Sequence, residues 1–159
     1  MNSTANYRRI HNEVKQIEKQ AGEYEKMFKL SRKDDNIYRW HAIIYGPSDS
    51  LYEGYKFELD IHLPDNYPFS PPNVKFLTPI QHVNVNAKGD ICLDILKNNW
   101  TPSLNIQSVI VSLGQLLTYP NTDDPFNSDL AELYRTNKKE YTKKIKEYCQ
   151  KNAIPADKQ

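Results

Sequence analysis

The residue types around Cys92 suit nucleophilic chemistry. The thiol lies between two aliphatic residues, three positions after Gly89 and ten after His82. A thiol among polar side chains suits a surface groove and a nucleophile, although free cysteine is also among the most buried residue types. A lone nucleophile and a buried small hydrophobe therefore both stay open at this point. The polar neighbours within residues 82–100 are Asn84, Asn86, Lys88, Asp90, Asp94, Asn98 and Asn99.

Metal chemistry is a poor fit for the same thiol. Structural zinc needs about four nitrogen or sulfur ligands at short spacings. The chain has two cysteines, Cys92 and Cys149, and no C-x-x-C pair. We therefore expect no metal site and no cofactor.

Length and charge limit the possible partners. A chain of 159 residues with a formal net charge of +1 predicts a single domain over residues 1–159, with no global attraction to nucleic acid. No apolar run approaches the roughly 20 residues that span a bilayer, so we expect no membrane association. Two distant cysteines and the lack of a leader sequence favour a reducing location, in the cytoplasm, the nucleus or both.

Hydrophobic periodicity predicts an α+β fold around this segment. An apolar stripe at Ile10, Val14, Ile17 and Ala21 indicates a first helix that ends at Gly22. Alternation then predicts a four-stranded antiparallel meander. Its strands fall at about 27–32, 37–44, 52–63 and 74–77.

Three more helices are expected after Cys92. Asn105 can cap a central helix whose wide apolar face packs on the sheet and which ends before Pro120. Two C-terminal helices follow, at about 128–135 and 138–151. We expect the tail from Asn152 to fray.

A stiff loop, PDNYPFSPP at 64–72, separates the third and fourth strands. Proline lacks a backbone donor and fixes φ, so this run neither pairs in a sheet nor forms a helix. Phe69 at its tip either folds back onto the core or stands out as a binding anchor.

Five motifs together resemble those of the ubiquitin-conjugating enzymes, in order and spacing, over nearly the whole chain. They are YPFSPP at 67–72, HVN at 82–84, GDICLDIL at 89–96, WTP at 100–102 and PNTDDP at 120–125. The resemblance covers the catalytic core of the family. It implies the family's fold, in which four antiparallel strands pack on a central helix with one N-terminal and two C-terminal helices.

The same resemblance implies the chemistry. Cys92 would accept ubiquitin from an activating enzyme as a thioester and pass it to lysines of protein substrates. Asn84 would stabilise the oxyanion or hold the loop that does so. Asp124 would orient or deprotonate the incoming lysine, and Asn121 would help to shape its path. His82 is expected to be structural, through ring bonds to nearby backbone.

Asp94 is likewise expected to be a structural residue beside the site. The family's usual His-Pro-Asn reads His82-Val83-Asn84 here. Valine is at home in extended backbone, so we expect the fold to survive and Asn84 to keep its place.

Partner surfaces follow from the resemblance too. Ligases, RING-type or other, would meet the first helix and two loops, and ubiquitin would bind both covalently and non-covalently. In this chain the implied ligase-binding residues are Lys15, Phe69, Thr101, Pro102 and Ser103.

Three alternatives stay open. The first is a non-catalytic ubiquitin-binding variant of the same fold, which the presence of Cys92 disfavours. The second is a cysteine hydrolase pairing Cys92 with a histidine, for which the candidates are His11, His41, His62 and His82. The third is the same chemistry with a ubiquitin-like modifier in place of ubiquitin.

Overall fold

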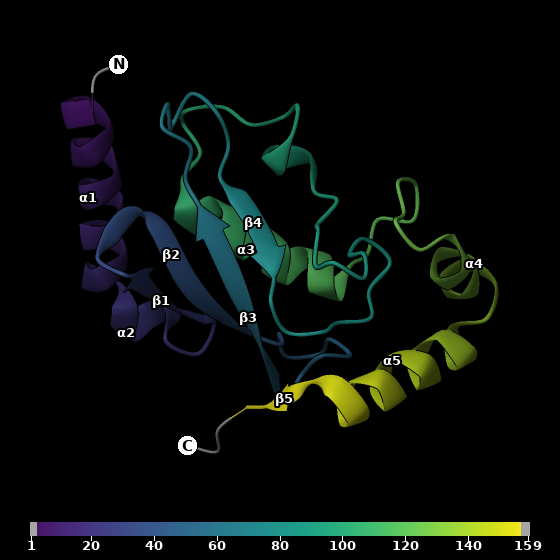
Figure 1. The fold of residues 1–159 in the computed structure, drawn as a ribbon. Coiled ribbons are helices and arrows are strands. Elements are labelled where there is room, and N and C mark those ends of the chain that lie inside the picture. The colour runs from purple at the N-terminus through teal and green to yellow at the C-terminus, as the bar shows by residue number, and fades with distance from the viewer. Residues whose placement is uncertain (1–2, 157–159) are drawn as a thin grey trace.

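A four-stranded antiparallel meander forms the centre of the molecule (Figure 1). The computed structural model describes residues 3–156, with side chains from residue 5. Neighbouring strands in the sheet follow one another along the chain, as the alternating sequence predicts. Their bounds are β1 Phe28–Lys33, β2 Asn36–Tyr45, β3 Tyr55–His62 and β4 Asn73–Phe76.

Apolar side chains fix the register of the two central strands. Trp40, Ala42 and Ile44 of β2 are buried, and all three lie opposite buried residues of β3. A slip of one residue would turn this whole set toward solvent. The paired residues are Trp40 with Ile61, Ala42 with Leu59 and Ile44 with Phe57.

The third strand begins at Tyr55, three residues later than the sequence prediction. Gly54 explains the difference, because its φ of 90° is left-handed and interrupts extended backbone. Tyr52 is nevertheless buried, and its hydroxyl donates to the carbonyl of Gln81 at 2.5 Å. It therefore belongs to the core without belonging to the strand.

Helix α3 (Ile106–Thr118) crosses behind the sheet (Figure 1). The Asn105 side chain accepts a hydrogen bond from the Ser108 backbone N–H at 2.8 Å, which confirms the predicted cap. The apolar face predicted for this helix is buried. Its members are Ile106, Val109, Ile110, Leu113, Leu116 and Leu117.

The first helix is shorter than expected. Helix α1 (Ser3–Lys19) ends before Gly22, which instead lies inside the four-residue helix α2 (Ala21–Tyr24). Ile10 and Ile17 are buried as predicted, whereas Ala21 is exposed. The backbone turns at Gln20, whose N–H donates to the carbonyls of Gln16 and Ile17 and so closes the helix. The apolar stripe therefore stops one turn earlier than predicted.

The predicted fraying of the C-terminal tail is wrong for residues 152–156, and residues 157–159 of that tail lie outside the described residues. The chain ends its described part in a short strand, β5 (Ile154–Pro155). The elements before it are the 3₁₀ helix η1 (Asp94–Leu96), α4 (Ser128–Thr136) and α5 (Lys138–Asn152). Strand β5 pairs with Tyr55 and Lys56 of β3, where β4 does not reach. The Ala156 N–H also donates to the Gly54 carbonyl at 2.8 Å. The edge of β3 beyond β4 thus holds the tail through backbone pairing.

Within residues 3–156, none of the helices is long and apolar enough to cross a membrane. The same residues contain no group of three or more histidine, cysteine, aspartate or glutamate side chains that could hold a metal ion.

Removal of β5 tests its contribution to stability. A chain that stops after Ala153 loses the β3 pairing, and its free energy of unfolding is expected to fall by about 1–2 kcal/mol because a few backbone hydrogen bonds are lost. Urea unfolding measures this difference. A chain that stops after Ala156 keeps β5 and is the matched control. Equal urea midpoints for the two chains would contradict the assignment of a stabilising role to β5.

Candidate functional site

A tight hairpin presents Cys92 beside the end of β4. Val85 bridges Ile91, and Asn86 accepts hydrogen bonds through its side chain from the backbone N–H groups of Lys88 and Asp90. Gly89 closes this turn at a φ of 88°. A Cβ atom there would lie 2.1 Å from the Phe76 carbonyl oxygen, so glycine is required for space as well as for conformation.

Cys92 is a buried residue, with an exposed fraction of 9%. Its backbone N–H donates to the Asn84 carbonyl at 2.8 Å, which anchors the thiol to the segment at 82–84. The thiol donates to Oδ2 of Asp124 at 3.1 Å, and Nζ of Lys97 donates to Sγ at 3.3 Å. The sulfur therefore lies between a carboxylate and an ammonium group.

Asn84 holds the loop that carries Asp124. Its Nδ2 donates to the carbonyls of Asn121 at 2.8 Å and of Asp124 at 3.1 Å, and its Oδ1 accepts from the Asn121 N–H at 2.9 Å. The residue is 0% exposed. Both amide protons are already donated to this loop. Of the two roles implied by the resemblance, this geometry favours loop bracing over direct oxyanion binding.

His82 fixes the backbone before Asn84. Its Nε2 donates to the Leu116 carbonyl at 2.8 Å, and its Nδ1 accepts from the Asn84 N–H at 2.9 Å. These are ring bonds to nearby backbone, as the sequence predicts. Burial lowers the pKa of His82 to about 4, although the bond to Leu116 opposes this effect. The imidazole is thus neutral at physiological pH and ties the site to α3.

Val83 occupies the position of the family's usual proline without loosening the site. Its side chain is fully buried, and its carbonyl accepts from the backbone N–H groups of Phe126 and Asn127 at 2.9 and 3.1 Å. The loop at residues 121–127, here called the acidic loop, is therefore fixed at its far end by Val83 and at its near end by Asn84.

Lys97 is a site residue that the sequence analysis did not single out. The 3₁₀ helix η1 reverses the chain after Cys92, and Asp94 stabilises it by accepting from the Ile95 N–H at 2.8 Å and from the Asn99 amide at 3.0 Å. This places Asp94 in the structural role expected for it. The reversal carries the exposed Lys97 side chain back over the sulfur, five residues along the chain.

The charges around the thiol act in opposite directions. Burial raises the pKa of Cys92 above its ordinary value, and the hydrogen bond to Asp124 raises it further. The Lys97 ammonium, which favours the thiolate, partly offsets both effects. In the described part of the chain, the hydrogen-bond partners of the sulfur are Asp124 and Lys97, and no histidine forms a Cys-His pair with it.

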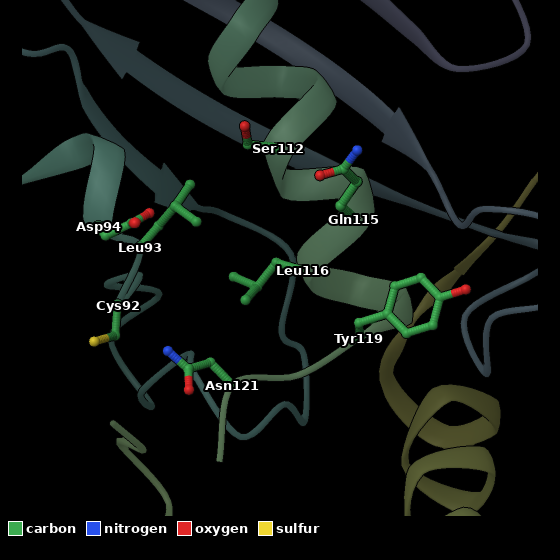
Figure 2. A pocket seen from close by; sticks show the side chains of 8 residues that line it. All are labelled: Cys92, Leu93, Asp94, Ser112, Gln115, Leu116, Tyr119 and Asn121. Carbon is green, nitrogen blue, oxygen red and sulfur yellow. The ribbon is translucent and has the colours of Figure 1, made fainter. Parts of the chain in front are cut away.

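A groove of about 590 Å³ runs from Cys92 along the C-terminal half of α3 (Figure 2). Cys92 and Asn121 lie at one end of this groove and Tyr119 at the other, with Leu116 between them. The amide nitrogen of Asn121 points toward Cys92. The remaining lining residues are Leu93, Asp94, Ser112 and Gln115.

The residues implied in ligase binding are all exposed: Lys15, Phe69, Thr101, Pro102 and Ser103. Phe69 is 73% exposed, so of its two predicted placements the outward one is confirmed. Nε1 of Trp100 donates to the Pro68 carbonyl at 2.8 Å, which joins the Phe69 loop to the segment at 101–103.

The carboxylate of Glu13 connects three parts of the chain next to this surface. It accepts from Nε of Arg9 at 2.7 Å, from the Tyr67 hydroxyl at 2.7 and 2.9 Å and from the Ile106 N–H at 2.9 Å. Burial and the Glu13 charge hold the pKa of Tyr67 well above its usual range. The first helix, the Phe69 loop and the start of α3 therefore meet at one carboxylate, which the sequence analysis missed.

Comparisons with known proteins match nearly the whole chain, including the site. A family model described as "Ubiquitin-conjugating enzyme" matches residues 9–149. A probable ubiquitin-conjugating enzyme E2 of Acanthamoeba polyphaga mimivirus is 55% identical over 150 residues, which is 94% of this chain and 94% of that protein.

Alkylation of Cys92 tests the electrostatics of the site, because the thiolate is the reactive form. Asp124→Asn removes the negative charge that holds the proton on sulfur and replaces one carboxylate oxygen with a donor NH2 group, so the midpoint of the iodoacetamide rate profile is expected to move to lower pH. Lys97→Met should move the midpoint to higher pH. Asp123→Asn is the matched control and should leave it unchanged. A midpoint that rises in Asp124→Asn would contradict the geometry.

Proposed function

Because the chain belongs to the ubiquitin-conjugating enzyme family, we propose that it carries ubiquitin as a thioester on Cys92 and passes the acyl group to a lysine amine. An activating enzyme supplies the acyl group in its own thioester form. The observation that carries this proposal is the position of Sγ, at the end of an open groove and between Asp124 and Lys97.

Loading needs little help from the protein. The Cys92 thiolate attacks the carbonyl of the incoming thioester, and the leaving group is itself a thiolate, so one carbon–sulfur bond replaces another. A small fraction of thiolate suffices, because cysteine is strongly nucleophilic. The groove along α3 offers space for an extended peptide that leads to the sulfur.

Loading also changes the partner of Asp124. In the free enzyme, Oδ2 of Asp124 accepts from the thiol. A thioester has no proton on sulfur, so the carboxylate becomes available to an incoming lysine ammonium. Such a charge-assisted bond positions the amine beside the carbonyl carbon and removes water from it. Asp124 then needs no unusual basicity to assist the transfer.

Asn84 acts in this scheme through Asp124. Its three hydrogen bonds hold Asn121 and Asp124 in place. Displacement of a catalytic group by about 1 Å can lower the rate on the order of a hundredfold. The amide nitrogen of Asn121 points toward Cys92 (Figure 2), which supports a role beside the path of the incoming lysine. We assign Asn84 a positioning role and Asn121 a role in shaping the lysine's path.

Ligases are proposed to dock on the surface formed by Lys15, Phe69 and residues 101–103. The support is the exposure of these side chains and the tie between the two loops through Trp100. An exposed aromatic on a stiff loop is a suitable anchor for a partner's pocket.

Loading with ubiquitin, ATP and an activating enzyme tests the proposal. The wild-type chain should form one adduct that a reductant removes, and Cys92→Ala should abolish it. Cys149→Ala is the matched control, because Cys149 is buried in α5 and burial raises its pKa to about 11. An adduct that persists in Cys92→Ala would overturn the assignment. Loading by a different modifier only would overturn the ubiquitin part, and cleavage of ubiquitin esters without an activating enzyme would indicate a hydrolase.

Discharge of the loaded enzyme onto free lysine, with and without a RING domain, tests the docking surface. Phe69→Ala should lower the ratio of stimulated to unstimulated discharge by about tenfold or more, because a buried interface aromatic is typically a hot spot. Leu77→Ala is the control, since Leu77 is also an exposed apolar residue but lies outside the proposed surface. Equal ratios for Phe69→Ala and the wild type would contradict the docking site.

A further inference from the structure

Transfer of the acyl group needs a hydrogen-bond donor that Asn84 does not supply. When an amine attacks a thioester, the carbonyl oxygen gains negative charge, and a positioned donor lowers the barrier. Nδ2 of Asn84 already donates to the carbonyls of Asn121 and Asp124, and the side chain is 0% exposed. A third acceptor would have to displace the loop that this amide holds. The donor for the oxyanion must therefore come from another residue near Sγ of Cys92.

Lys97 places a positive charge in contact with the reacting sulfur. Its Nζ lies 3.3 Å from Sγ of Cys92, and it also lies 5.9 Å from the centre of the Phe126 ring. The Phe126 N–H is bonded to the Val83 carbonyl, so this ring belongs to the fixed acidic loop. An ammonium over an aromatic face is attracted by the ring. The η1 reversal and the acidic loop together hold the cation beside the sulfur.

We propose that Lys97 is a further catalytic residue, whose ammonium stabilises the negative charge that develops on the acyl oxygen during transfer from Cys92. This inference rests on the proposed function, since it requires a thioester on Cys92. It divides the reaction between two side chains. Asp124 positions the incoming amine, and Lys97 stabilises the oxyanion.

The ammonium of Lys97 is within reach of that oxygen. The carbonyl carbon is bonded directly to Sγ, so its oxygen lies two bonds from the atom that Nζ already contacts. A thioester sulfur carries neither a proton nor a negative charge, and it is a weak acceptor. The ammonium therefore gains when it turns from the sulfur to an oxyanion, since a charge-assisted hydrogen bond is about twice as strong as a neutral one. Lys97 is exposed and its stem is flexible, so a small rotation suffices.

Lys97 takes part in the step without a change in its own protonation. The lone pair of the acceptor nitrogen forms a bond to the acyl carbon, and the carbonyl π electrons move to the oxygen. The carbonyl then re-forms, the carbon–sulfur bond breaks, and its electron pair leaves on the Cys92 thiolate. Asp124, whose Oδ2 lies 3.1 Å from the same sulfur, can take the proton of the attacking nitrogen and return it to the thiolate. The products are an amide on the acceptor and a free thiol on Cys92.

Asn121 is the other donor near the thiol. Its Oδ1 accepts from the Asp123 N–H at 3.0 Å, and its amide nitrogen points toward Cys92 (Figure 2). A neutral amide stabilises an oxyanion less than an ammonium does. Among residues 5–156, whose side chains are described, the side-chain nitrogen that donates to Sγ is that of Lys97. Charge and position therefore both favour Lys97 as the oxyanion donor.

The test is a single-turnover experiment on the whole chain. The enzyme is loaded with ubiquitin, the activating enzyme is stopped by removal of ATP and magnesium, and free lysine is added. The ubiquitin–lysine conjugate is followed rather than the loss of thioester, so side reactions of the enzyme do not count. Lys97→Met should lower the rate constant by about tenfold or more, because it removes an oxyanion donor. Lys97→Arg keeps the charge and should restore most of the rate. Lys88→Met is the matched control and should leave it unchanged.

Two further measurements separate oxyanion stabilisation from other roles of the charge. Hydroxylamine is an uncharged acceptor that does not need a carboxylate to bind it, and Lys97→Met should slow its reaction by a similar factor. The iodoacetamide midpoint of the same variant measures the effect on the leaving thiolate. The rate loss should exceed the factor that this midpoint shift allows, which is about tenfold per pH unit.

Four results would each overturn the inference. They are an unchanged rate in Lys97→Met, no recovery in Lys97→Arg, a loss confined to free lysine, and a loss no larger than the midpoint shift allows. These results would leave the proposed function standing, whereas failure to form any thioester would overturn the proposed function itself.

Discussion

The buried amide of Asn84 is the interaction on which the site depends. It joins two segments 37 residues apart, one carrying the backbone partner of Cys92 and the other carrying Asp124. The 3.1 Å contact between the Cys92 thiol and Asp124 exists because this amide holds the second segment against the first. An amide with no exposed surface loses the full value of any bond that it leaves unmade, about 1–3 kcal/mol. Release of the Asp124 loop would cost this free energy, which keeps the loop in place.

The sheet and the central helix supply the rigid support for that amide. His82 binds a carbonyl of α3 through one ring nitrogen and the Asn84 backbone through the other. Burial keeps this histidine neutral, so one nitrogen donates while the other accepts. Val83 adds the last two backbone bonds to the acidic loop. The packing against α3, the neutral state of His82 and the position of the acidic loop therefore depend on one another.

Local patterns predicted most of the fold and part of the site. The four-stranded meander, the capped α3 helix and the buried faces of both depend on residue periods that a single sequence displays. The capture of the tail by β3 could not be predicted, because the pairing of Ile154 with Lys56 depends on where α5 ends in space. The contact of Lys97 with the sulfur depends on a single 3₁₀ turn, and Glu13 reads locally as an ordinary charged position of α1. The resemblance to the family singled out Cys92, Asn84 and Asp124 together, whereas their spacing alone did not.

Glu13 has a consequence for association. The carboxylate binds Arg9 within α1, Tyr67 next to the Phe69 loop and the first residue of α3. Segments that share one anchor cannot move independently, so the surface above them is already ordered before any partner arrives. A partner then loses less conformational entropy on binding than it would against loose loops. Weak and rapidly reversible contacts can consequently suffice for a partner that binds this face.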